Sequence, residues 1–83
     1  MTTIYRLKFY NFEGDNTFEL YHNYTNARAR FNELWNDYRK FEEFKGDRRS
    51  KKHSYLSYFD PNYNAESTTI IFEECALESL FFD

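Results

Sequence analysis

The sequence predicts a two-layer α+β domain, in which one amphipathic helix covers one face of a four-stranded antiparallel sheet. Two observations lead to this prediction. Segments with alternating apolar and polar residues flank a single segment with helical periodicity, and the order along the chain is strand, strand, helix, strand, strand (ββαββ). The 83 residues suit one small domain over 1–83.

The first two strands are expected to form a hairpin over residues 3–22. Residues 3–11 alternate, and the residues on their apolar side are Tyr5, Leu7 and Phe9. The segment 13–16, Glu-Gly-Asp-Asn, is rich in turn-forming residues. Residues 17–22 alternate again, and we expect Phe18 and Leu20 to face the core while Glu19 and Tyr21 face outward with Arg6, Lys8 and Tyr10.

A helix is predicted from about residue 25 to residue 44. The preceding segment, Asn23 to Asn26, offers several residues that cap helix N-termini. An apolar stripe follows at spacings of four and three residues, formed by Ala27, Phe31, Leu34, Tyr38 and Phe41. Gly46 is typical of the position just past a helix C-terminus.

The remaining sequence predicts a basic loop over 45–53, a second hairpin over 54–75 and a short tail over 76–83. Tyr55 to Phe59 and Thr68 to Glu74 have the β-rich composition of strands, and the segment 60–64 between them has turn chemistry. The uncovered sheet face is expected to show large apolar side chains from these strands as well: Tyr55, Phe59 or Ile71, depending on register.

Aromatic residues exceed what one small core needs, because the chain has ten Phe, eight Tyr and one Trp. A surplus of Tyr favours binding, since Tyr combines a large apolar ring with one polar group. We expect the excess on the uncovered face, the second hairpin and the tail. The residues expected to contact a partner are Tyr10, Tyr21, Tyr55, Tyr58, Asp60, Tyr63, Glu66, Glu73 and Glu74.

Charge is segregated along the chain, whose net charge is −3. The basic loop carries Arg48, Arg49, Lys51 and Lys52 next to Tyr55 and Tyr58, an arrangement that suits nucleic acid, an acidic protein surface or simple solvation. Residues 60–83 contain six acidic residues and neither Lys nor Arg, so they could imitate phosphates or serve as a solvated edge.

The sequence shows none of the motifs that mark an enzyme, so we expect a protein without catalytic activity. It lacks a glycine-rich phosphate loop, and His22 and His53 do not have metal-ligand spacing. We therefore expect neither cofactor nor metal. Cys75 is the single cysteine, and no apolar run has the length of a membrane span, which indicates a cytoplasmic protein that does not enter membranes.

The segment from His22 to Leu34, His-Asn-Tyr-Thr-Asn-Ala-Arg-Ala-Arg-Phe-Asn-Glu-Leu, resembles a pattern in small phage and mobile-element proteins. The resemblance covers about residues 4–44. It implies an inhibitor of the anti-CRISPR kind, which binds and blocks a host nuclease or CRISPR effector in the bacterial cytoplasm. It assigns no functional residue. Two alternatives remain, a small nucleic-acid-binding module that uses the basic loop and a homodimer with a structural role.

Overall fold

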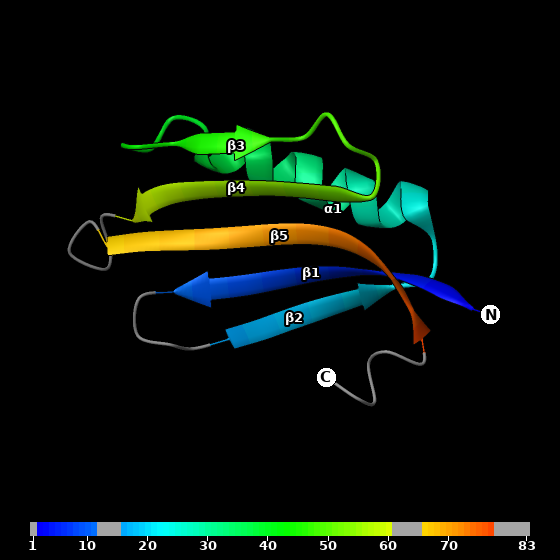
Figure 1. The fold of residues 1–83 in the computed structure, drawn as a ribbon. Coiled ribbons are helices and arrows are strands. Elements are labelled where there is room, and N and C mark those ends of the chain that lie inside the picture. Colours follow the sequence, from blue (N-terminus) through cyan, green and yellow to red (C-terminus); the bar gives the residue numbers. More distant parts are fainter. Residues whose placement is uncertain (1, 12–15, 61–65, 78–83) are drawn as a thin grey trace.

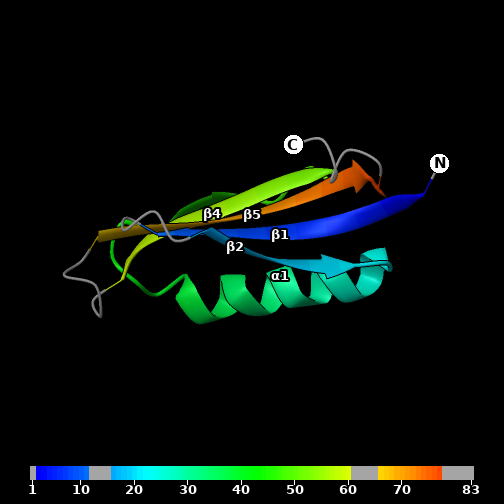
Figure 2. The same cartoon turned by 90° about the horizontal axis from the view of Figure 1, so that it is seen from below.

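The protein is an α+β structure with one helix on one face of a five-stranded antiparallel sheet (Figures 1 and 2). The computed structural model describes residues 2–11, 16–60 and 66–77. The sheet has the strand order β2-β1-β5-β4-β3. The elements along the chain are β1 (Thr3–Asn11), β2 (Asn16–Tyr21), α1 (Tyr24–Tyr38), β3 (Lys45–Asp47), β4 (His53–Asp60) and β5 (Glu66–Ala76).

The core lies between α1 and the centre of the sheet. The predicted stripe supplies its helical side, since Ala27, Phe31 and Leu34 are all buried. The strands contribute the opposite side, and their buried hydrophobic residues in this cluster are Leu7, Leu56, Tyr58, Ile70 and Phe72. Burying one large apolar side chain stabilises a fold by about 1.5–3 kcal/mol, so this cluster accounts for the docking of α1.

The helix begins where the sequence predicts and ends earlier. Asn23 is the N-cap, and its side chain accepts a hydrogen bond of 3.1 Å from the backbone N–H of Asn26. The prediction of a helix to residue 44 is wrong, because α1 ends at Tyr38. Beyond it the N–H of Phe41 bonds to the carbonyl of Tyr38, and Glu43 has a positive φ of 56° that turns the chain back toward the sheet.

Ring packing explains why the apolar stripe outlasts the helix. Tyr38 stacks on Tyr58 of β4 with ring centroids 4.3 Å apart, and Phe41 meets the same ring edge-on at 5.4 Å. Both Tyr38 and Phe41 therefore pack against the core, although only Tyr38 is helical. A 3.6-residue spacing continued by one residue in a turn is indistinguishable in sequence from one more helical turn.

The predicted basic loop starts with a fifth strand, so four strands in ββαββ order is incorrect. In β3, Gly46 lies opposite Leu56 of β4. Gly46 does not end the helix but leaves room for the indole of Trp35 against the sheet. A Cβ at this position would lie 2.5 Å from Cζ3 of Trp35 and 2.9 Å from the carbonyl oxygen of Tyr55.

The second strand has the opposite orientation to the one predicted. Tyr21 and Glu19 lie opposite Tyr5 and Leu7 of β1, so they share the face that α1 covers. Phe18 and Leu20 therefore lie on the uncovered face and are 61% and 47% exposed. On the covered face Tyr21 packs against the core, and Glu19 pairs with Arg30 of α1, so this side of β2 has partners on the helix side of the sheet.

Replacing Gly46 with Ala should destabilise the protein by about 1–3 kcal/mol, because the added methyl group overlaps Trp35 and a backbone carbonyl that cannot move independently. Urea denaturation measures this change in the free energy of unfolding. Lys45→Ala, at the exposed neighbouring position of the same strand, is the control and should change it by less than about 0.5 kcal/mol. Equal stability of the two variants would contradict the packing of Trp35 on β3.

Candidate binding surface

The face of the sheet opposite α1, which we call the open face, gathers the exposed apolar side chains. Figure 2 shows α1 on one side of the sheet only, within the described residues. The large hydrophobic residues that are exposed in this part of the chain all belong to the open face by register: Phe18, Leu20, Tyr55 and Phe59. One row across the strands runs Phe18, Lys8, Ile71, Tyr55 and Asp47.

The centre of the open face is charged and internally paired. Glu73 of β5 accepts a hydrogen bond of 2.8 Å from Nε of Arg6, and Nζ of Lys8 lies 3.1 Å from the same carboxylate. Burial favours the neutral form of Glu73, but the hydrogen bonds from Arg6 and Lys8 outweigh it and hold the pKa of this carboxyl below its ordinary value. The three residues thus form a cationic cluster with one neutralising carboxylate.

The open face is not exposed throughout. Ile4, opposite Cys75 near one end, is buried, although it points away from α1 by register. The exposed apolar groups lie instead toward the middle and the other end, on β2 and β4.

The hairpin between β3 and β4 is a structured, cationic feature. Asp47 accepts hydrogen bonds from the backbone N–H, Nε and Nη2 of Arg49 at 3.0, 3.1 and 2.7 Å. The side-chain bonds, followed by the backbone bond, lower the pKa of Asp47 to about 2, so this carboxylate stays ionised at neutral pH. Ser50 then accepts from the backbone N–H groups of Lys52 and His53, which closes the turn.

An arginine of the helix holds this hairpin in place. Nη1 of Arg28 donates to Oγ of Ser54 at 2.8 Å, and Nη2 donates to the carbonyl oxygen of Arg48 at 2.5 Å. The guanidinium also lies 5.0 Å from the ring centroid of Phe72, a favourable cation–π contact. Ser54 in turn donates to the carbonyl oxygen of Ser50 at 2.7 Å. The backbone of the turn is therefore joined to α1 at Arg48 and at Ser54.

The four predicted basic residues differ in their surroundings. Arg48 lies over the ring of Trp35 at 4.4 Å and reaches Asn32 of α1, whereas Arg49 pairs with Asp47. Lys51 and Lys52 are exposed at the turn. Beside them is a concavity of about 400 Å³, which is lined by Asp47, Arg49, Ser50, His53 and Tyr55. The concavity meets the open face at Tyr55.

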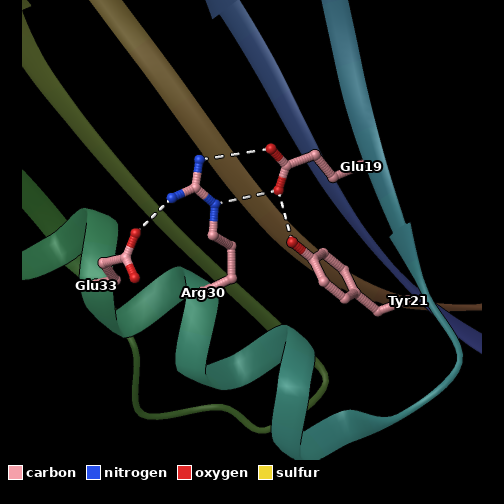
Figure 3. Close-up of polar contacts among 4 residues, drawn as sticks. All are labelled: Glu19, Tyr21, Arg30 and Glu33. Atoms are coloured by element: carbon pink, nitrogen blue, oxygen red, sulfur yellow. Dashed lines mark hydrogen bonds and ion pairs between the residues drawn. The ribbon is translucent and has the colours of Figure 1, made fainter.

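A polar network on the covered face accounts for two residues that the sequence placed outside. Figure 3 shows Arg30 of α1 extending between Glu33 of the helix and Glu19 of β2. The Tyr21 hydroxyl donates to Glu19 at 2.8 Å. Burial, followed by the hydrogen bond and the negative charge of Glu19, raises the pKa of Tyr21. Glu19 and Tyr21 thus join β2 to α1 and do not belong to the open face.

The predicted contact residues are consequently divided between the two faces. Tyr10, Tyr55 and Glu73 lie on the open face. Glu74 belongs by register to the other face of the sheet and is exposed there. Tyr58 is 3% exposed beneath Tyr38, which corrects its expected role in binding. Asp60 and Glu66 form the last pair of β4 and β5. Tyr63, the turn around it and residues 78–83 of the tail lie outside the described residues.

Two residues of the open face, Phe18 and Leu20, were expected in the core, whereas Phe59 was expected on this face, depending on register, but was not among the predicted contact residues. Phe18 and Leu20 look like core residues because large apolar side chains alternate with Glu19 there. The partners on the other side of β2 are distant in sequence: Glu19 meets Arg30, eleven residues away, and Tyr21 packs against the core, so neither gives a local signal. Within the described ranges, no group of His, Cys, Asp and Glu side chains is arranged to hold a metal ion, and no helix is long and apolar enough to cross a bilayer.

Replacing Glu73 with Gln should make stability less dependent on pH. Because pairing lowers the pKa of Glu73, its contribution is complete above the ordinary value of 4.5 and is lost as pH falls through the lower folded value. We expect the variant to be about 1–2 kcal/mol less stable than the wild type at pH 7, with the difference shrinking toward pH about 3. Urea denaturation at both pH values measures it.

The neighbouring exposed residue provides the control for this experiment. Glu74→Gln removes the same charge from the same strand, but Glu74 belongs to the other face of the sheet. Its loss of stability at pH 7 should be much smaller. A pH profile of Glu73→Gln that runs parallel to that of the wild type would contradict the role of the Arg6–Glu73–Lys8 cluster.

Comparison with known proteins assigns this chain to no family. No protein-family model matches the chain, and neither curated protein sequences nor solved structures give a significant match.

Proposed function

We propose that this chain is a non-enzymatic interaction module that binds a protein partner through the open face of its sheet. The observation that carries the proposal is the gathering of Phe18, Leu20, Tyr55 and Phe59 on this one face, while α1 covers the other. Two exposed apolar pairs, on β2 and on β4, thus flank the charged centre of the open face, and exposed apolar groups with polar groups among them are typical of protein interaction sites.

The charges of the open face favour a partner with acidic groups. Arg6, Lys8 and Lys45 lie on this face against Glu73 and Asp47, and the hairpin adds Arg48, Arg49, Lys51 and Lys52 beside it. Electrostatic complementarity mainly determines specificity and association rate, whereas buried rings supply most of the affinity. Glu73 is already hydrogen-bonded, which reduces the penalty for covering it.

For the partner class we propose a bacterial nucleic-acid-handling protein, such as a defence nuclease or CRISPR effector, which the bound module would block. The support for this class is the resemblance over residues 4–44. The acidic composition of residues 60–83 supports it as well, since such a segment would complement a cationic nucleic-acid groove.

Phe18→Thr with Leu20→Thr should weaken partner binding while the fold survives, because both side chains are exposed and Thr retains strand propensity. We expect at least a tenfold weaker complex, corresponding to about 1.4 kcal/mol. Capture from a bacterial lysate identifies the bound protein, and titration of the purified partner then measures its affinity for each variant. Circular dichroism confirms folding.

A matched double variant on the outer side of α1 is the control. Ala29→Ser with Asn36→Ser changes two exposed helix residues and should capture the same partner as the wild type. Loss of the partner with both double variants, or with neither, would refute the open face as the interface. A partner without any role in nucleic-acid handling would refute only the partner class. Light scattering that shows a stable dimer broken by the β2 variant would favour a second copy as the occupant.

A further inference from the structure

The hairpin between β3 and β4 combines the features that one unit of a single-stranded nucleic acid requires. It offers a concavity of about 400 Å³ whose lining includes the ring of Tyr55 and the guanidinium of Arg49, and the exposed Lys51 and Lys52 follow in the same turn. Tyr55 is 39% exposed, so one part of its ring is available to another planar group. Single-stranded nucleic acids bind through the same combination of stacking rings and cationic surface.

The residues inside the concavity distinguish a nucleobase from an acidic side chain. Asp47 lines it and remains ionised at neutral pH, so a carboxylate entering the concavity would meet another negative charge. A neutral base carries N–H donors, and a carboxylate oxygen that accepts one bond from Nη2 of Arg49 retains capacity to accept another. His53 and Tyr55 add planar surfaces on the same wall.

The residues outside the concavity suit the backbone of such a strand. Lys51 and Lys52 are exposed at the tip, whereas Arg48 packs over Trp35 on the side of the sheet that α1 covers. Arg28 holds the carbonyl of Arg48, and Ser54 holds the carbonyl of Ser50. Little ordering of this turn is therefore needed when an anion binds. The overall acidity of the chain does not oppose this arrangement locally, because residues 45–53 carry five cationic residues and one acidic residue.

We propose that this hairpin binds a nucleotide unit of a single-stranded nucleic acid, with its base in the concavity against Tyr55 and the neighbouring phosphates on Lys51 and Lys52. The proposed site shares Tyr55 with the open face but does not use Phe18 or Leu20, so variants of β2 separate it from the protein interface.

Fluorescence anisotropy with labelled single-stranded DNA and RNA of about 12 nucleotides tests the proposal over salt concentrations from about 50 to 200 mM. The wild type should bind one or both with an affinity that falls as salt rises. Lys51→Ala with Lys52→Ala should reduce the slope of log affinity against log salt by about 1.4 in magnitude, because each lost phosphate contact on a single strand contributes about 0.7.

Variants of Tyr55 separate stacking from charge. Tyr55→Leu should weaken binding at least about fivefold without changing the salt slope, since loss of one base–aromatic stack costs about 1 kcal/mol or more. Tyr55→Phe keeps the ring and should bind nearly as well as the wild type. Equal binding by Tyr55→Leu and the wild type would overturn the assignment of the base to the concavity.

A charge-matched control distinguishes a local site from a general loss of charge. Arg39→Ala with Lys40→Ala removes two exposed cations beyond the end of α1, so its net charge equals that of the Lys51 and Lys52 variant. It should retain the wild-type slope. The proposal is wrong if both double variants lose the same amount of salt slope, or if no binding appears at the lowest salt concentration. It is also wrong if a glutamate-rich peptide competes as well as the unlabelled oligonucleotide, because that would indicate an acidic protein segment as the ligand.

The β2 variant makes this test independent of the protein interface. Phe18→Thr with Leu20→Thr should bind the oligonucleotide as the wild type does, even where it loses the protein partner. Loss of oligonucleotide binding in this folded variant would place the nucleic acid on the open face as a whole and overturn the hairpin site.

Discussion

The packing of Phe72 between the helix and the sheet is the constraint on which the rest of the structure depends. Its ring is fully buried on β5 and lies 5.9 Å from the ring of Phe31 on α1. Because side chains alternate along a strand, an inward Phe72 places Ile71 and Glu73 on the open face. Pairing then transmits this orientation to β1 through Leu7 and to β4 through Ser54, so one residue determines the character of both faces.

The same packing reduces the apparent surplus of aromatic residues. Three rings belong to the buried cluster and eight more pack against it, which is more than a helix stripe and one alternating hairpin suggest. The contacts among these rings are mostly edge-on or tilted, with Tyr38 and Tyr58 as a stacked pair. Few rings therefore remain exposed on the open face. Their shared position on one face says more about function than the number of aromatic residues in the chain.

The fold also decides how the charged residues can be used. Arg28 connects the core to the basic hairpin, since its guanidinium packs near Phe72 while it bonds to Ser54 and Arg48. Arg30, two residues later, attaches β2 to the helix through Glu19. Cations of the helix thus act as structural groups, whereas Lys51 and Lys52 remain exposed for contacts with other molecules.

The sequence by itself determined the elements whose signals are local. Alternation located β1, the stripe of Ala27, Phe31 and Leu34 located the buried side of α1, and Asn23 located its start. It also placed Tyr10 on the open face, and Tyr55, Phe59 or Ile71 there depending on register, and the pairing of the strands puts all four on that face.

The tertiary structure alone decided the orientation of β2, the end of α1 and the existence of β3. Each depends on a contact between residues that are distant in sequence: Glu19 with Arg30, Tyr38 with Tyr58, and Trp35 with Gly46. Local hydrophobicity assigns Phe18 and Leu20 to the core, but in the register with β1 it is Tyr21 that packs against the core and Glu19 that meets Arg30. The surface that we propose for binding exists because these long-range contacts outweigh the local pattern.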